Sequence, residues 1–523
     1  MHVQVGAHSS RTESKVKRFS FPEYIRKAII DSMAARYSLV IRNGTVIDGT
    51  RAPRYEADVA LQEGRIVAIG RLDEARADSE IDASGKIVAP GFIDAHTHDD
   101  RLMLSAPAMA PKVSQGVTTV VAGNCGISLA PAPNGMQAPV PVPLDLLDDE
   151  GAWFRFKTFK EYVQALHAAP AAVNCALLVG HSMLRVQTMD GLERPASAGE
   201  IGRMRAMVNE ALAAGAIGVS TGLYYEPACA APAEEVIEIC RPLSQRNGIY
   251  CTHMRDEGDQ VIESLEETFR VGRELGVPVV VSHHKVVGRP NHGRSAQTLP
   301  LIRARMREQA IGLDCYPYCA SSTILSFGRT LIASKTLVTW SKPHPRFAGM
   351  ALDEIAAKMN LSLEKTVEKL LPAGAIYFSM DESDVQRILA FESTMIGSDG
   401  LPHDAAPHPR LWGTFARVLG HYARGLNLFP LETAVYKMTG LTAKTFGLAE
   451  RGVLKEGFAA DITIFDAGAV DEAASFAKPI QPAKGIDRVI VNGEIIWRGG
   501  KPTGARPGCV LQRAGQKTGG SLR

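Results

Sequence analysis

Ala89-Pro90-Gly91-Phe92-Ile93-Asp94-Ala95-His96-Thr97-His98-Asp99-Asp100 places two histidines, two residues apart, at the end of an apolar run. Side chains at positions i and i+2 of a strand point to the same face, so His96 and His98 can reach one metal ion. An isolated His-x-His is a weak signal. The rest of the chain decides whether these histidines are ligands.

Further side chains that bind metals recur where later apolar segments end. They are Cys125 after 118–124, His253 after 248–252, His283 after 277–282, and Asp399 after 394–398. Each follows a short predicted strand. In a parallel α/β barrel the carboxyl ends of the strands converge on one mouth, where catalytic residues lie. A single one of these residues is as easily a buried histidine or a core cysteine. All six together predict a metal site at a barrel mouth.

The body of the chain alternates apolar strands with helical segments, predicted at 198–214, 232–246, 260–275 and 295–311. This alternation is typical of βα units around a parallel sheet. Residues 326–390 interrupt the rhythm and contain helical candidates at 351–358 and 363–371. We interpret them as an insertion near the mouth, with the character of a lid.

Short β-rich runs occupy both ends of the chain, separated by the turn pairs Asn43-Gly44, Glu63-Gly64 and Asn492-Gly493. Such pairs between apolar runs predict hairpins. We therefore expect a TIM-like (β/α)8 barrel plus a small β-sandwich built from both chain ends. The expected boundaries are 1–36 for a disordered extension, 37–90 and 451–512 for the sandwich, 91–450 for the barrel, and 513–523 for a flexible tail.

Composition narrows the classes of function. The 523 residues carry 58 basic and 56 acidic side chains, a net charge of +2, which argues against nucleic acid as a partner. No apolar run approaches the roughly 18 to 20 residues that span a bilayer, so we expect no membrane segment. Eight irregularly spaced cysteines and no secretory leader favour a cytoplasmic protein with reduced thiols. Residues 22–36 could form a short helix.

Five short motifs in this order resemble a known family. His-x-His, Asn-Cys-Gly, Thr-His-Met-Arg, Ser-His-His-Lys and Gly-Ser-Asp-Gly are similar to the amidohydrolase superfamily, and within it to the N-acyl-D-amino-acid deacylases, or D-aminoacylases. The resemblance covers roughly residues 37–512. It also includes the segments 178–181, 215–227 and 503–508. It implies the same barrel and terminal β unit that the alternation of strands and helices predicts.

The resemblance implies a zinc centre. Cys125, His253 and His283 would hold one essential zinc, while His96 and His98, sharing Cys125, would form a second and weaker site. A thiolate ligand independently favours zinc over magnesium or manganese. Zinc lowers the pKa of a water molecule to near neutrality. Asp399 fits the general base that takes the water proton and returns it to the leaving nitrogen, although Asp-Gly is also a common turn pair.

An N-acyl amino acid carries a free α-carboxylate, so its pocket should offer cations and hydroxyl groups. Lys285, two residues after His283, faces the same side of its predicted strand and can project into the mouth. The resemblance implies that Tyr225, Tyr316, Ser322 and Arg410 also grip this carboxylate. Tyr224 and Tyr318 are adjacent rivals for the two tyrosine positions. Strand alternation points His284 away from the metal, and we interpret it as structural. His181 and His403 are candidates for supporting groups.

Three alternatives stay open. Hydantoinases and dihydroorotases open cyclic amides and usually bridge two metals with a carboxylated lysine on a middle strand. The corresponding residues 216–222 contain no lysine, and Cys125 offers the bridge instead. A dipeptidase for D-terminal dipeptides uses the same chemistry. A scaffold that lost its chemistry should have lost ligands, whereas all six are present.

We therefore predict a zinc-dependent enzyme that hydrolyses a small-molecule N-acyl-D-amino acid to a D-amino acid and a carboxylate. The preference for the D form comes wholly from the resemblance. The preferred side chain and acyl group, and the oligomeric state, are not predicted by the sequence.

Overall fold

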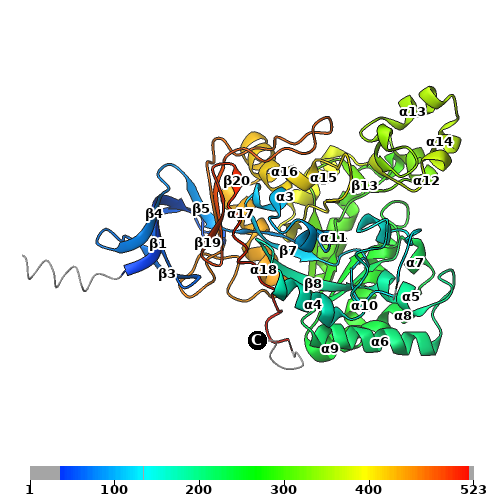
Figure 1. Cartoon of the computed structure of the whole chain (residues 1–523), viewed down its shortest axis with the longest axis horizontal. Coiled ribbons are helices and arrows are strands. Elements are labelled where there is room, and N and C mark those ends of the chain that lie inside the picture. Colours follow the sequence, from blue (N-terminus) through cyan, green and yellow to red (C-terminus); the bar gives the residue numbers. More distant parts are fainter. Residues whose placement is uncertain (1–35, 134, 517–523) are drawn as a thin grey trace, which may run out of the picture.

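The computed structural model describes residues 36–133 and 135–516, and its centre is an eight-stranded parallel barrel (Figure 1). The strands run in the order β16 (Thr394–Ile396), β12 (Ile311–Cys315), β11 (Val279–Val281), β10 (Ile249–His253), β9 (Gly218–Gly222), β8 (Asn174–Gly180), β7 (Val117–Ala122) and β6 (Phe92–Asp94). The Ala95 amide donates to the Ile396 carbonyl at 3.1 Å, which links the two end strands. The predicted barrel is confirmed.

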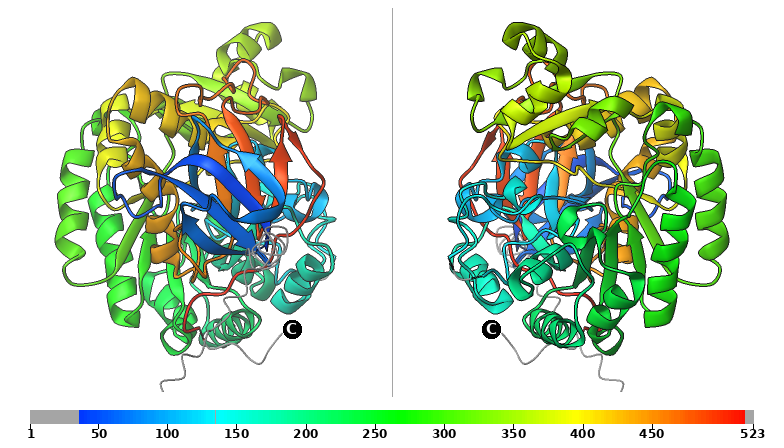
Figure 2. Two further views of the ribbon diagram at one scale, coloured as in Figure 1. Left: turned by 90° about the vertical axis from the view of Figure 1, so that its left-hand side faces the viewer. Right: turned by 90° about the vertical axis from the view of Figure 1, so that its right-hand side faces the viewer.

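Helices cover the outside of the barrel in Figure 2. The longer ones are α4 (Phe159–Ala168), α5 (His181–Thr188), α6 (Ala198–Ala213), α8 (Ala233–Cys240), α10 (Val261–Leu275), α11 (Ser295–Arg305), α15 (Glu382–Ala390), α16 (Arg410–Arg417) and α17 (Leu431–Met438). Shorter ones are α2 (Leu102–Ser105), α3 (Ala110–Val113), α7 (Glu226–Cys229), α9 (Pro242–Arg246) and α18 (Gly440–Phe446), and a π-helix, η4, spans Val418–Gly425.

Two predicted helices differ from the observed ones. The helix expected at 232–246 is broken into α8 and α9, because Pro242 at the start of α9 has no N–H with which to continue the α8 hydrogen-bond ladder. The helix expected at 295–311 ends at Arg305, because Ile311 already pairs with Val279 in the barrel. In both cases a helix is present as expected, and its boundary is set by a local breaker or by tertiary pairing.

A nine-stranded mixed sheet lies beside the barrel and joins the two ends of the chain (Figure 1). Its strands are β1 (Arg36–Val46), β2 (Tyr55–Gln62), β3 (Arg65–Gly70), β4 (Arg76–Asp82) and β5 (Ile87–Pro90) from one end, and β17 (Ile462–Phe465), β18 (Ile486–Val491), β19 (Glu494–Arg498) and β20 (Lys501–Pro502) from the other. β5 pairs with β17, so a β unit built from both ends, as predicted, is present.

The three turn pairs have different outcomes. Glu63-Gly64 and Asn492-Gly493 form the predicted hairpin turns with positive φ at each residue. The hairpin predicted at Asn43-Gly44 is wrong, because β1 runs straight through it with a bulge. β1 pairs with β2 on one side and with β4 and β5 on the other, and this pairing overrides the local turn preference. A Cβ at Gly44 would lie 2.4 Å from Val88 Cγ2.

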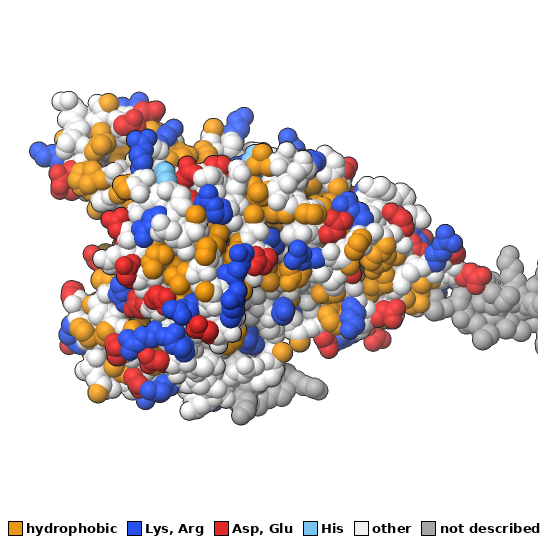
Figure 3. Space-filling view, turned by 180° about the vertical axis from the view of Figure 1, so that it is seen from behind, with side chains coloured by type: hydrophobic (Ala, Val, Ile, Leu, Met, Phe, Trp, Pro, Cys, Tyr) orange, Lys and Arg blue, Asp and Glu red, His pale blue; other side chains and the backbone are white. Residues whose placement is uncertain are grey.

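Between β12 and β16 the chain leaves the barrel and forms a separate lobe. A three-stranded antiparallel sheet of β13 (Ala320–Ile324), β14 (Thr336–Ser341) and β15 (Ala373–Phe378) carries α12 (Phe327–Ile332), α13 (Leu352–Met359) and α14 (Leu363–Leu370). The two helices expected within 326–390 are α13 and α14. In Figure 3 the lobe projects from the body, and the surface recedes beneath it.

The structure describes no helix long and apolar enough to cross a membrane within residues 36–133 and 135–516. Residues 22–35 of the short helix expected at the amino end lie outside the described residues, as does most of the tail expected at 513–523. On the face drawn in Figure 3, basic and acidic side chains are interspersed.

Candidate metal centre

The six predicted metal and base residues meet at the carboxyl ends of five barrel strands. His96 and His98 follow β6, Cys125 follows β7, His253 ends β10, His283 follows β11, and Asp399 follows β16. All six side chains are buried. Sequence segments as far apart as residues 96 and 399 are therefore brought to one point by the closure of the barrel.

The two histidines converge for a different reason from the one expected. β6 ends at Asp94, so His96 and His98 lie in the following loop rather than on a strand. The loop is fixed by backbone hydrogen bonds: the Thr97 amide donates to the Val121 carbonyl at 3.0 Å, and the Asp399 amide donates to the His96 carbonyl at 2.8 Å. These bonds tie the loop to β7 on one side and to the segment that carries Asp399 on the other.

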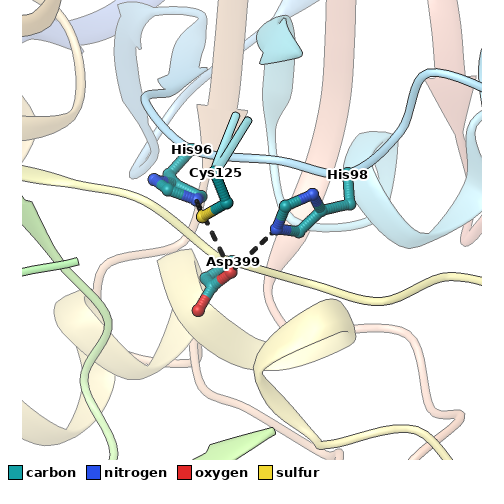
Figure 4. Close-up of side chains that lie close together, drawn as sticks. All are labelled: His96, His98, Cys125 and Asp399. Atoms are coloured by element: carbon teal, nitrogen blue, oxygen red, sulfur yellow. Dashed lines mark hydrogen bonds and ion pairs between the residues drawn. The ribbon is translucent and has the colours of Figure 1, made fainter. Parts of the chain in front are cut away.

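The first group of potential ligands is His96, His98, Cys125 and Asp399, drawn in Figure 4. One ligand atom from each lies within 4.8 Å of the others. Asp399 Oδ1 is 3.2 Å from His98 Nε2 and 3.6 Å from His96 Nε2. Cys125 Sγ is 3.3 Å from His96 Nε2. The four side chains point toward one another across the mouth of the barrel.

The second group is Cys125, His253 and His283, again within 4.8 Å of one another. Cys125 Sγ is 3.3 Å from His283 Nε2, and the rings of His253 and His283 meet edge to face. Neither ring nitrogen of His253 has a hydrogen-bond partner among the described residues, although the residue is buried. Buried nitrogens without partners, beside a thiol and a second imidazole, fit a zinc ion. Cys125 belongs to both groups.

The backbone at three of these residues is in the left-handed region. Cys125, His283 and Asp399 have φ values of 55°, 36° and 48°. Residues other than glycine rarely adopt such values, and they are concentrated at functional sites where the surrounding structure enforces them. Here the strained backbone belongs to Cys125, which both groups share, to His283 of the second group, and to Asp399, the candidate base.

The electrostatics favour ionised forms of the thiol and the carboxylate. Burial opposes ionisation of Cys125, but His96 and His283 hold the pKa of the thiol well below its usual range. Burial likewise opposes ionisation of Asp399, but Arg410 and the nearby histidines hold the pKa of that carboxyl well below its usual range. A thiolate binds metal and a carboxylate accepts a proton, so both groups are in the required state.

A cavity opens on this cluster, and nine of the eleven predicted site residues line it: His98, Cys125, Tyr225, His253, His283, Lys285, Tyr316, Ser322 and Asp399. The other two, His96 and Arg410, lie behind its wall. Arg410 Nη1 is 2.8 Å from Asp399 Oδ2, and its guanidinium lies 4.6 Å from the centre of the Tyr316 ring. The structure therefore brings all eleven residues to one site.

The residues considered as alternatives to this set do not line the cavity. Tyr225 lines the cavity, whereas Tyr224 is 38% exposed and stacks against Arg329. Tyr318 packs on His408 instead of facing the cavity. His284 turns away and contacts Thr298 Oγ1 at 2.8 Å.

The two supporting candidates also lie outside the cavity wall. His181 Nε2 is 3.7 Å from a carboxylate oxygen of Glu235, behind the mouth. His403 has an unpartnered Nε2 among the described residues. Neither lines the cavity.

Sequence reasoning missed three charged residues of the site. Glu257 and Arg329 line the cavity. Lys112, fully buried, lies 2.8 Å from Asp94 Oδ2 and 3.3 Å from Asp99 Oδ2, beneath the His96 loop. Glu257 follows His253 by four positions in the same loop, a signal that could have been used. Arg329 comes from the inserted lobe, and nothing local indicates that it reaches the site.

The middle strand β9 contains no lysine that could be carboxylated, and Cys125 occupies the position between the two ligand groups. This arrangement differs from the lysine-bridged centre expected of a cyclic amidase. A parallel barrel with thiolate, imidazole and carboxylate groups at its mouth defines a metal-dependent hydrolase.

Comparison with known proteins agrees with this class. The sequence model of the amidohydrolase family matches residues 79–305 and 384–497. A D-aminoacylase of Alcaligenes xylosoxydans xylosoxydans is 58% identical over 91% of this chain and 98% of its own length. The chain belongs to the D-aminoacylase family of the amidohydrolase superfamily.

Solved structures extend the comparison. A D-aminoacylase described as having a binuclear metal centre, with one-metal activation and second-metal attenuation, superposes with a TM-score of 0.89 at 57% identity over 91% of this chain and all of the other. The N-acyl-D-glutamate deacylase of Bordetella bronchiseptica, complexed with zinc and a phosphonate mimic of the tetrahedral intermediate, gives 0.88 at 45% identity, again over 91% of this chain and all of the other.

Proposed function

We propose that this protein is a zinc-dependent deacylase that hydrolyses N-acyl-D-amino acids to a D-amino acid and a carboxylate. The observation that carries the proposal is that Cys125 belongs to both ligand groups, the first of which includes Asp399, and that it lines the same cavity as Lys285. Membership in the D-aminoacylase family supports the substrate class and its handedness.

Cys125, His253 and His283 would hold the essential zinc, and His96 and His98, with Cys125 shared, a second and weaker one. The donor set of one thiolate and two imidazoles matches catalytic zinc sites, which keep an open position. Zinc in such a site acts as a Lewis acid toward the amide carbonyl and lowers the pKa of water. The two relatives that carry metals, one zinc and one binuclear, support this choice.

Asp399 moves the proton. Its Oδ1 faces the ligand cluster, while its Oδ2 is held by Arg410 at 2.8 Å. The pairing keeps the carboxylate ionised and oriented, so that it takes a proton from the attacking water and then delivers it to the amide nitrogen as the C–N bond breaks. One group performs both transfers without leaving its position.

Lys285, Tyr225, Tyr316 and Ser322 form the part of the wall that holds the substrate α-carboxylate, and Arg410 contributes its charge from behind Tyr316. The Tyr225 hydroxyl contacts Thr323 Oγ1 at 3.1 Å, which fixes it at the edge of the inserted lobe. Burial of these groups excludes water and strengthens each interaction with the anion.

The alternatives use parts of the same site. A dipeptidase for D-terminal dipeptides would place an aminoacyl group where the proposal places the acyl group. A cyclic amidase lacks support, because β9 offers no lysine.

A cytoplasmic location remains a prediction from the eight cysteines, all of which are free.

The test is hydrolysis of paired N-acetyl-D- and N-acetyl-L-amino acids with methionine, leucine, aspartate and glutamate side chains by the zinc-loaded protein. Release of the free amino acid from D forms alone supports the proposal and identifies the preferred side chain. Equal turnover of both enantiomers, or none with zinc bound, contradicts it.

A further inference from the structure

A buried carboxylate that no step of the proposed reaction uses lies against the site. Glu257 is 4% exposed and lies in the loop between β10 and α10. The Val287 amide donates to its backbone carbonyl at 2.9 Å, so the loop after β10 is tied to the loop after β11. The first loop follows directly on His253, and the second contains His283; these are the two imidazoles of the second ligand group.

One oxygen of Glu257 makes two contacts with the site. Glu257 Oε1 accepts from Lys285 Nζ at 2.5 Å and lies 3.1 Å from His283 Nδ1. The other oxygen, Oε2, is 3.7 Å from His253 Nε2. A single side chain therefore touches both imidazoles of the ligand group and the cation that we assign to the substrate carboxylate.

The geometry at His283 fits an orienting hydrogen bond. Its Nε2 faces Cys125 Sγ at 3.3 Å, and its Nδ1 lies 3.1 Å from Glu257 Oε1 and 2.8 Å from Lys285 Nζ. A metal on Nε2 leaves the ring proton on Nδ1, and of these two neighbours only the Glu257 carboxylate can accept it. A histidine that binds metal through one ring nitrogen is usually held by a hydrogen bond at the other, and this bond fixes the orientation of the ring. Glu257 is the carboxylate in that position.

The contacts of Lys285 hold its ammonium group in one position. Lysine carries its charge on a flexible four-carbon stem, so its ammonium has no fixed position unless neighbours supply one. Here Glu257 Oε1 and the His283 carbonyl, the latter at 3.2 Å, both accept from Lys285 Nζ. The ammonium is thus held within reach of the cavity and cannot swing away from it.

We propose that Glu257 is a positioning residue that fixes His283 and Lys285 relative to each other. The inference rests on the proposed function, because it takes Lys285 as the group that binds the substrate carboxylate. In an N-acyl amino acid the α-carboxylate and the amide are attached to the same carbon, so their separation is set by covalent bonds. The spacing of Lys285 and His283 then decides whether a bound substrate presents its amide to the ligand cluster.

Glu235 offers a matched control. It is 2% exposed and forms an ion pair with Arg185, so its loss costs the protein a buried charge, as the loss of Glu257 does. It does not line the cavity. Lys285→Met separates the two functions of Glu257, because it removes the cation and leaves the contact between Glu257 and His283.

The experiment compares wild type, Glu257→Gln, Glu235→Gln and Lys285→Met as zinc-loaded proteins. Zinc affinity is measured by competition with a chelator, and KM and kcat are measured on N-acetyl-D-methionine in zinc-saturated buffer. We expect Glu257→Gln to lower zinc affinity about 10- to 100-fold and to raise KM as well. Lys285→Met should raise KM alone, and Glu235→Gln should change neither.

An unchanged zinc affinity or an unchanged KM in Glu257→Gln overturns the inference, since a shared positioning role requires both effects. If Glu257→Gln does not fold, Glu257→Asp replaces it, and the same two effects are expected because the shorter side chain cannot reach both partners. If wild type hydrolyses none of the D substrates, the proposed function fails. The zinc measurement then still decides whether Glu257 holds His283.

Discussion

Asp399 Oδ2 lies 2.8 Å from Arg410 Nη1 at the back wall of the cavity. The candidate base is therefore coupled to the arginine that we place near the substrate carboxylate. Its other oxygen, Oδ1, faces the ligand cluster, 3.2 Å from His98 Nε2 and 3.6 Å from His96 Nε2. A group held in this way needs no reorganisation at the moment of proton transfer.

Asp399→Asn is expected to retain zinc and to lose about 10²- to 10⁴-fold in kcat, because the amide keeps the shape of the side chain but cannot accept the proton. Zinc content and steady-state rates on the same preparation check this. A variant with full zinc and a near-normal rate would remove Asp399 as the base.

Cys125→Ala should lose zinc from both ligand groups, because Cys125 is the member that they share. The measurement is zinc per chain after dialysis. Cys240→Ala is the control: this thiol is also buried, but burial raises its pKa to about 12, so it stays protonated and should hold no metal. Equal zinc content in the two variants would contradict the bridging role of Cys125.

Lys112→Met is expected to destabilise the fold by about 3 to 5 kcal/mol, because it leaves Asp94 and Asp99 as buried carboxylates without their cation. Denaturant unfolding of the variant measures the free energy of unfolding. The control is Lys86→Met. The ion pair that it removes, between Lys86 and Asp487, is partly exposed and should contribute no more than about 1 kcal/mol to the free energy of unfolding. Similar losses in both variants would argue against a structural role for the Lys112 cluster.

Asp145→Asn should change how stability depends on pH. Burial, with Asp149 and Asp404 nearby, raises the pKa of Asp145 to about 7 in the folded protein. In the unfolded chain the same carboxyl titrates near 4, so the folded state binds more protons between these values, and its stability falls as pH rises through this window.

The neutral asparagine cannot ionise, so the variant should gain Tm relative to wild type above pH 7 and gain little near pH 4. Thermal unfolding from pH 4 to pH 8 checks the difference. Parallel curves for the two proteins would show that Asp145 does not titrate in this way.

The candidate metal ligands could be predicted from the sequence because each lies at the end of a short apolar strand or in the loop just after it, and the barrel places such positions together whatever the intervening sequence. The same rule located Asp399. Lys112 was not predictable, because its partners Asp94 and Ser398 lie 18 and 286 residues away, and a lysine in a short helix such as α3 is usually solvated. Its burial depends on the closure of the barrel.

The errors in predicting the fold from the sequence also come from contacts between distant segments. Asn43-Gly44 has the local chemistry of a hairpin, but β1 gains partners on both sides by continuing through it. Arg329 reaches the cavity only because the inserted lobe folds back over the mouth. Local patterns thus indicated the candidate ligands and base that the structure brings together, whereas docking of distant segments decided which other residues surround them.

The most direct test of the account is the rate of hydrolysis of N-acetyl-D-methionine and of its L enantiomer, measured before zinc is removed with a chelator, after removal, and after zinc is restored. The account predicts turnover of the D form alone, loss of that turnover without zinc, and recovery when one equivalent of zinc is returned. Full activity in the zinc-free protein, or equal rates on the two enantiomers, would contradict it.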